Sequence, residues 1–228
     1  MNNTTVAPVI TIDGPSGSGK GTVSRRIASH LGWHFLDSGA LYRLVALVVL
    51  KRQLDFLDEA SISNAAKELD VEFKVDTGVS EAQILLEGRV VGDEIRSEQC
   101  GNSASKVAAL PAVREALLAR QRDFRMTPGL VADGRDMGSV VFPDARLKIF
   151  LDASPEERAQ RRYKQLKEKG MNANLRDLLA EIKVRDARDR NRSVAPLVAA
   201  PGAVLVDSTT QGIDEVVAGI LEAWSKLT

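Results

Sequence analysis

The feature that most constrains the fold of this chain is a glycine-rich run that directly follows a short apolar segment. Residues 8–13 read Pro-Val-Ile-Thr-Ile-Asp, and a short apolar run rich in β-branched residues predicts a buried strand. The run Gly14–Thr22 follows, and residues 19–30 then show the apolar spacing of a helix. A strand, a glycine-rich turn and a helix in this order begin a parallel βαβ unit.

The rest of the chain continues the alternation of strands and helices, with one interruption. Further parallel strands are predicted at residues 33–37, 130–133, 147–151 and 203–207. Helices are predicted at 38–51 with Ser38 as N-cap, at 102–125 with a break near Pro111, from Pro155 onward, and at 213–226. This pattern predicts an α/β fold.

The interruption lies in the middle of the chain. A helix at residues 59–69 and three short strands at 71–75, 83–87 and 89–91 predict a small meander. We therefore expect a core formed by residues 1–60 and 105–228, with a module inserted at about residues 61–104.

Composition excludes several classes of protein. The 228 residues contain 31 Lys and Arg against 31 Asp and Glu, a balance that argues against a general nucleic-acid or membrane-surface binder. The single cysteine, Cys100, excludes an intrachain disulfide, and His30 and His34 have no metal-ligand partner at the right spacing. The longest apolar run, residues 44–50, is too short to span a bilayer, and residues 1–5 do not resemble a signal peptide. We expect a cytoplasmic, monomeric protein.

The spacing within the glycine-rich run indicates phosphate binding. Gly14 is followed after four residues by Gly19 and Lys20, and such a loop can wrap phosphates with its backbone N–H groups. Lysine then reaches the β- and γ-phosphates. The residues expected to bind ATP are Gly14, Pro15, Ser16, Gly17, Ser18, Gly19, Lys20, Gly21 and Thr22, called the phosphate loop below. A chance glycine-rich turn and a dinucleotide site are weaker alternatives, the latter because the third glycine of its motif is missing.

One position of the phosphate loop departs from the usual pattern. The residue after Lys20 is normally Ser or Thr, whose hydroxyl binds Mg²⁺, but here it is Gly21. We infer that phosphates and waters hold the Mg²⁺ and that Thr22 meets the α-phosphate. Asp133, at the carboxyl end of a predicted strand, is the candidate that orients these waters, and its alternative role is to cap the following turn.

The arginines indicate a second phosphorylated substrate. The chain has neither the Asn-Lys-x-Asp run of a GTPase nor the strand ending in Asp-Glu that is typical of ATP-driven motors. It does carry arginines on several separate elements. One set of guanidinium groups could bind an acceptor phosphate while another neutralises charge on the transferred group. These are Arg43, Arg114, Arg135, Arg158, Arg161, Arg162, Arg185, Arg188, Arg190 and Arg192. For any single helix arginine, a solvated surface position is the alternative.

Several runs of residues resemble one family, the bacterial cytidylate kinases. They are Ile12–Thr22, Leu36–Arg43 with its Asp-Ser-Gly-Ala core, Asp133–Gly138, Val141–Ala145 and Arg185–Arg192. The phosphate loop is shared by many families, whereas the Asp-Ser-Gly-Ala and Gly-Arg-Asp-Met-Gly runs are more specific. The resemblance covers nearly the whole chain, including the inserted meander.

The resemblance implies phosphoryl transfer from ATP, with Mg²⁺, to CMP or dCMP in pyrimidine metabolism. It implies a three-layer P-loop fold with a five-stranded parallel sheet, an inserted NMP-binding module, and a helical lid at about residues 155–170. The implied catalytic residues are Lys20, Arg135, Arg158 and Arg162, with Arg161 added to the ATP site. The implied CMP site consists of Ser38, Arg43, Arg114, Arg135, Asp136, Arg185, Asp189 and Arg192.

Two alternatives stay open at this point. One is a P-loop kinase for UMP, dTMP or a phosphate-free metabolite, and the other is a nucleotide-binding regulator without transfer activity. Asp186 and Asp189 could also pair with arginines of their own helix rather than serve a substrate.

Overall fold

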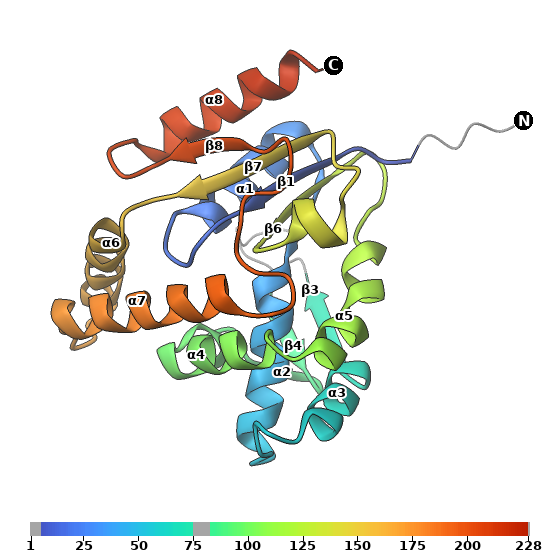
Figure 1. Ribbon diagram of the computed structural model, residues 1–228, viewed down its shortest axis with the longest axis vertical. Coiled ribbons are helices and arrows are strands. Elements are labelled where there is room, and N and C mark those ends of the chain that lie inside the picture. The colour runs from blue at the N-terminus through green and yellow to red at the C-terminus, as the bar shows by residue number, and fades with distance from the viewer. Residues whose placement is uncertain (1–5, 75–82, 228) are drawn as a thin grey trace, which may run out of the picture. The chain divides into compact units, whose positions relative to one another are not determined.

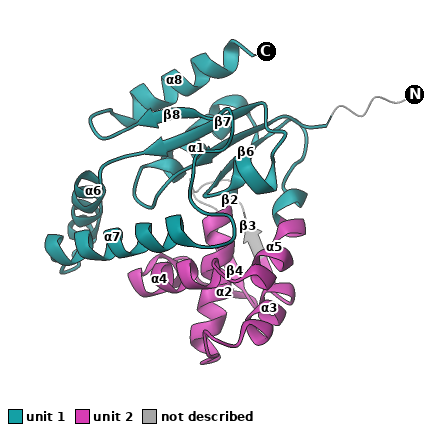
Figure 2. Cartoon of the chain, in the orientation of Figure 1, with its two compact units in different colours: residues 1–37, 121–228 teal, residues 38–120 magenta. Residues whose placement is uncertain are grey.

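The protein is described by a computed structural model over residues 6–74 and 83–227. It divides into two compact units, one built from residues 1–37 with 121–228 and the other from residues 38–120 (Figure 2). The second unit begins earlier and ends later than the module expected at 61–104. The assignment of that module to nucleoside monophosphate binding stays a prediction.

The first unit is built on a five-stranded parallel sheet, as predicted (Figure 1). Its strand order is β2-β6-β1-β7-β8. The strands are β1 (Val9–Asp13), β2 (His34–Asp37), β6 (Leu130–Gly134), β7 (Leu147–Asp152) and β8 (Val204–Asp207). The central strand β1 is buried along its whole length, which explains its β-branched composition. Because the strands are parallel, their carboxyl ends meet at one edge.

Two helices, α1 (Lys20–Leu31) and α8 (Ile213–Ser225), cover the sheet of the first unit. Two others, α6 (Pro155–Glu168) and α7 (Leu175–Asn191), pack against each other. Ile27 of α1 and Ile220 of α8 belong to the same apolar cluster as Ile12 of β1. The ring of Trp224 meets that of Trp33 edge-on, with 5.1 Å between the ring centroids. The apolar faces of α1 and α8 thus pack on the sheet.

The second unit combines four α-helices with a small antiparallel sheet of order β3-β4-β5. The helices are α2 (Ser38–Lys51), α3 (Glu59–Lys67), α4 (Glu98–Val107) and α5 (Pro111–Asp123), with a 3₁₀ turn η1 (Glu94–Arg96). The strands are β3 (Val71–Lys74), β4 (Gln83–Leu86) and β5 (Arg89–Val90). Residue 75 of the predicted first strand lies outside the described residues.

One helical prediction is confirmed and one helical feature was not predicted. The predicted break near Pro111 divides the segment into α4 and α5, and Pro111 begins the second helix. The segment η2 (Met137–Val141) is a single π-helical turn that was not predicted. Such turns are rare and often occur at functional sites.

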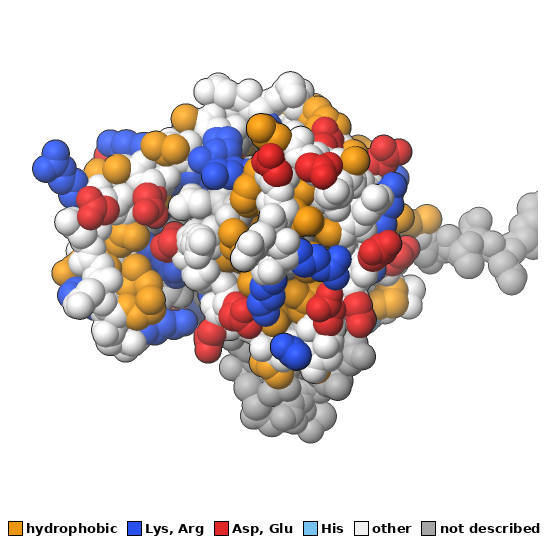
Figure 3. Space-filling model, turned by 90° about the horizontal axis from the view of Figure 1, so that it is seen from below, with side chains coloured by type: hydrophobic (Ala, Val, Ile, Leu, Met, Phe, Trp, Pro, Cys, Tyr) orange, Lys and Arg blue, Asp and Glu red, His pale blue; other side chains and the backbone are white. Residues whose placement is uncertain are grey.

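Charge is spread evenly over the surface that Figure 3 shows. Basic and acidic side chains lie interspersed on this face.

Among the described residues, no helix has the length and apolar character that a membrane crossing requires.

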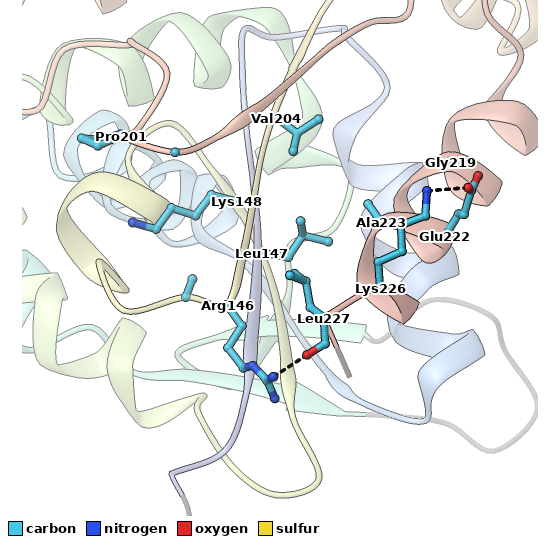
Figure 4. Close-up of a pocket in the computed structure, with 12 residues that line it drawn as sticks. Arg146, Leu147, Lys148, Pro201, Val204, Gly219, Glu222, Ala223, Lys226 and Leu227 are labelled. Atoms are coloured by element: carbon cyan, nitrogen blue, oxygen red, sulfur yellow. Dashed lines mark hydrogen bonds and ion pairs between the residues drawn. The ribbon is translucent and has the colours of Figure 1, made fainter.

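The amino ends of β7 and β8 border an open cavity of about 560 Å³ (Figure 4). Leu147, Lys148 and Val204 line one side of it, and Glu222 of α8 and Lys226, just after this helix, line the other. Since the phosphate loop follows the carboxyl end of β1, this cavity lies at the opposite end of the sheet.

Candidate active site

The phosphate loop joins the carboxyl end of β1 to the start of α1. Gly14 has a φ of +149°, and a Cβ at this position would lie 2.0 Å from the main-chain oxygen of Leu151 in β7. Only glycine therefore allows the chain to leave β1 so close to its neighbour. The first turn of α1 then points its N–H groups toward the loop, as a phosphate cradle requires.

The outer side of the phosphate loop is held by residues distant in the sequence. Arg158 Nη1 donates to the main-chain oxygen of Ser16 at 3.0 Å, and Ser208 Oγ donates to that of Ser18 at 3.0 Å. Arg161 also donates to Ser18 O, at 3.4 Å. These bonds fix the loop's carbonyl groups and thereby its main-chain conformation.

Lys20 is buried and lies at the centre of the site. Its Nζ donates to Pro15 O at 2.8 Å and lies 3.9 Å from Asp133 Oδ1. Burial, assisted by the positive charge of Arg135, lowers the pKa of Lys20 to about 7. Burial also raises the pKa of Asp133 to about 6, against the opposing effect of Lys20. Both groups thus titrate close to neutral pH.

The turn after β6 is held by Asp13, the last residue of β1. Its carboxylate oxygens accept hydrogen bonds from Met137 N and Gly138 N, each at 2.8 Å. Burial raises the pKa of Asp13 to about 7, although these two N–H donors act in the opposite direction. The bonds fix the start of η2 and so position the preceding residues Arg135 and Asp136.

Helix α7 brings further charged residues to the same edge of the sheet. Arg135 Nε donates to Asp189 Oδ2 at 3.2 Å, and Asp189 is buried. The positive charge of Arg185 contributes to the lowered pKa of Lys20, so Arg185 also lies near the phosphate loop. Arg192, just beyond α7, is buried and donates from Nε to Ala195 O. Within the first unit, Arg135, Arg185 and Asp189 thus lie close to Lys20 or to one another.

The remaining acceptor candidates belong to the second unit. The Arg114 guanidinium of α5 lies 5.8 Å from the ring centroid of Tyr42 in α2. Ser38 is one helical turn before Tyr42, so α2 and α5 bring Ser38 and Arg114 to the same region of this unit. Arg43 Nη1 donates to Ile95 O at 3.0 Å.

The three α6 arginines, expected together over the ATP phosphates, lie in three different environments. Arg158 is 1% exposed and forms a bidentate ion pair with Asp186 of α7. Arg161 is half-buried and donates to Ser208 O, while Arg162 donates to Gln165 Oε1. Asp186 and Asp189 thus each pair with an arginine of another element.

The carboxylates of the site suit a metal ion held through phosphates and waters. Within residues 6–74 and 83–227, no group of three or more His, Cys, Asp or Glu side chains could hold a metal by itself. A Cβ on Gly21 would lie 3.4 Å from Asp133 Oδ2, so the carboxylate of Asp133 faces this side-chain-free position. One carboxylate beside a phosphate cradle is the usual protein contribution to a Mg²⁺ site.

Three supporting residues, Asp13, Asp186 and Ser208, were not among the predicted site residues. Asp13 and Ser208 each lie at or just beyond the carboxyl end of a parallel strand, a signal that was available in the sequence. Asp186 shows no such signal, because its partner Arg158 is 28 residues away. Only the packing of α6 against α7 reveals the pair.

Comparison with known proteins identifies the family. The family model for cytidylate kinase matches residues 10–226. The cytidylate kinase of Aeromonas salmonicida is 60% identical over 216 residues, which are 95% of this chain and 93% of that protein. The chain belongs to the cytidylate kinase family. The resemblance inferred from the sequence motifs is thus confirmed, and with it the class of enzyme, an ATP-dependent kinase.

Further relatives agree with this assignment to the cytidylate kinase family. The cytidylate kinase of Serratia proteamaculans is 59% identical over 214 residues, 94% of this chain and 93% of that protein. Among solved structures, a gluconokinase from Sinorhizobium meliloti matches with a TM-score of 0.46 and 17% identity, over 97% of this chain and 94% of that chain. This last match is too distant to bear on the substrate.

Proposed function

We propose that this chain transfers the γ-phosphoryl group of ATP to CMP or dCMP, forming ADP and CDP or dCDP. Besides the family, the observation that supports this proposal is the arrangement of Lys20, Arg135 and Asp189 at the carboxyl end of the sheet. The buried lysine of the ATP loop lies close enough to Arg135 for that guanidinium to lower its pKa. Arg135 is in turn bonded to Asp189 of the acceptor-binding helix. The residues proposed to bind ATP and those proposed to bind the acceptor therefore lie next to one another.

The phosphate loop would bind the ATP phosphates with main-chain N–H groups and Lys20. To do so, Lys20 Nζ exchanges its bond to Pro15 O for a phosphate oxygen. The anionic phosphates favour the charged lysine and raise its pKa from about 7. Arg161 and Arg162, both half-buried on α6, would neutralise charge on the transferred group.

The acceptor phosphate needs no strong general base, because its attacking oxygen is already anionic. Catalysis then consists of in-line positioning and charge neutralisation. Arg43, Arg135, Arg185 and Arg192 would hold the acceptor phosphate and ribose. Guanidinium groups suit this task because their planar donors match phosphate oxygens in pairs.

Cytosine would be read by Ser38, Arg114 and Asp189. The base offers an amino donor, which a hydroxyl or carboxylate oxygen accepts, and neighbouring acceptors, which arginine satisfies. Asp136, a buried residue next to Arg135 in the chain, would support the base or that arginine. Asp189 has the sugar hydroxyls as an alternative partner.

Mg²⁺ would be bound by the ATP phosphates and by waters that Asp133 orients. When bound, it neutralises phosphate charge during transfer. With a pKa of about 6, the Asp133 carboxyl is largely ionised at neutral pH and can accept hydrogen bonds from such waters. We further infer that the protein works as a monomer in the cytoplasm, with ATP and CMP or dCMP as its partners and without nucleic acid or membrane.

The decisive experiment is an acceptor panel. ATP with Mg²⁺ is offered together with CMP, dCMP, UMP, dTMP or AMP in a coupled assay for ADP. We expect rapid turnover with CMP or dCMP and slow turnover with the other monophosphates. Equal rates for CMP, UMP and AMP would refute cytosine selection. Slow ATP hydrolysis that no acceptor accelerates would favour the nucleotide-binding regulator.

A further inference from the structure

Arg158 is the largest fully buried side chain of the described residues, at 1% exposure. It lies on the first turn of α6, where the resemblance placed a phosphate-contacting arginine. A buried guanidinium is tolerated only when ion pairs and hydrogen bonds compensate for lost water. Its partners therefore show what the side chain does.

These partners belong to three separate segments of the first unit. Nε donates to Ala153 O at 2.9 Å, immediately before α6. Nη1 donates to Ser16 O of the phosphate loop at 3.0 Å, and both terminal nitrogens donate to the carboxylate of Asp186 in α7. Each of its three nitrogens is engaged within the protein.

The Arg158–Asp186 ion pair joins the phosphate loop to α7, the helix proposed to bind the acceptor. Asp186 lies between Arg185 and Asp189 on α7, and Asp189 in turn holds Arg135. At the other end of the pair, a Cβ on Gly17 would lie 3.2 Å from Arg158 Cβ, so the loop packs closely on this residue. A shift of α7 relative to the loop must therefore break or distort this ion pair.

We propose that Arg158 and Asp186 form a positioning pair, which holds the phosphate loop in register with α7, and that Arg158 does not contact ATP phosphate. The inference rests on the proposed function. The positioning role differs from a phosphate-contact role in one respect. It predicts that loss of Asp186 harms the enzyme as much as loss of Arg158. It also predicts that the pair supports binding of both substrates, since it is bonded to elements of both sites.

The variants to compare are Asp186→Asn, Arg158→Met and the double variant Arg158→Met/Asp186→Asn. Steady-state kinetics give kcat and both KM values, and equilibrium titrations give the affinities for a non-hydrolysable ATP analogue and for CMP. We expect each single variant to lower kcat and to weaken both affinities, each by about tenfold or more, because one partner is left buried alone. The double variant should be no worse than either single one.

A second ion pair between the same two helices provides the control. Lys183 Nζ of α7 lies 2.9 Å from Glu156 Oε1 of α6, with both side chains more than half exposed. Glu156→Gln should leave kcat and both affinities unchanged, because exposed ion pairs contribute little. Equal losses in Glu156→Gln and Asp186→Asn would show that any contact between α6 and α7 suffices, and would overturn the proposal.

Two other results would also overturn it. One is a loss of ATP affinity in Arg158→Met with unchanged CMP affinity, accompanied by near-normal Asp186→Asn, as a phosphate contact requires. The other is an additive double variant. If Arg158→Met does not fold, the near-isosteric Asp186→Asn decides the matter. Titration with the ATP analogue does not depend on which acceptor is used, so failure of the acceptor panel is distinguishable from failure of the positioning pair.

Discussion

Charged side chains are buried at one end of the five-stranded sheet and exposed at the other. At the carboxyl end, Asp13, Lys20 and Asp133 are each at most 8% exposed and bond to the main chain or to one another. At the amino end, Lys226 and Glu222 beside the cavity pair with side chains 70% and 67% exposed. Burial of charge is costly and persists where binding or chemistry requires it. The contrast thus marks the functional edge without reference to any motif.

The largest expected effect is on catalysis, from Lys20→Ala at the carboxyl end. We expect kcat to fall by about 10²- to 10³-fold, because an electrostatic contact to the transferred group is lost. CMP affinity, measured by titration, should stay largely intact. Lys148→Ala, which removes a lysine at the amino-end cavity, is the control and should keep normal kinetics. Near-normal turnover of Lys20→Ala would contradict the proposed site.

The next largest effect is on stability, from Gly14→Ala. The added Cβ would overlap Leu151 O, and φ at this position is +149°. We expect the free energy of unfolding to fall by about 3 kcal/mol or more, measured by urea denaturation. Gly21→Ala is the matched control, because its Cβ would meet its closest neighbour at 3.4 Å and alanine favours a helix. Equal destabilisation by both substitutions would contradict the claim that the close contact and positive φ at Gly14 require glycine.

A smaller and pH-dependent effect is expected for Asp13→Asn. At low pH the protonated carboxyl can still accept with both oxygens, whereas the amide would place an NH₂ donor against one of the two N–H groups. We therefore expect a loss of about 1–3 kcal/mol in the free energy of unfolding at low pH. The pKa of Asp13 is raised from 3.8 to about 7 in the folded protein, so folding binds a proton in this range. The stability contributed by this carboxyl is therefore present at low pH and is lost as pH rises to about 7.

The difference in stability between wild type and Asp13→Asn should accordingly shrink from about pH 4 to about pH 7 and then level off. Urea denaturation across this range measures it. A difference that grows with pH would mean that the two N–H donors outweigh burial and that Asp13 is ionised throughout.

The smallest expected effect comes from Arg146→Ala at the amino end. Arg146 donates to Leu227 O and lies 5.6 Å from the ring centroid of Trp224. Loss of a partly exposed cation–π contact should cost about 0.5–1 kcal/mol of unfolding free energy, with unchanged kcat and KM. A clear loss of activity would abolish the contrast between the two ends of the sheet.

Most of the fold could be predicted from the sequence, because local patterns determine it. Apolar runs gave the parallel strands, and Pro111 gave the break between α4 and α5. The π-turn η2 was missed because it depends on two hydrogen bonds to Asp13, which lies 124 and 125 residues away from its donors. No local pattern carries such a contact.

The candidate site was predictable in composition but not in arrangement. The motifs indicated Lys20, Arg135 and Asp189, and the first unit brings all three to one edge. They did not reveal that Arg158 is buried against Asp186. The sequence motif does not indicate whether an arginine on a helix faces solvent or the interior. Packing between helices decides that difference.

The support of the phosphate loop from distant residues has a consequence for folding. Ser208 bonds to the loop across 190 residues and Arg158 across 142. Closing such long loops is entropically costly and slows folding. During synthesis the phosphate loop is made first, whereas Arg158 follows its loop partner by 142 residues and Ser208 follows by 190. A nascent chain that ends before Arg158 would thus carry the complete phosphate-binding motif and still lack the contacts that shape it.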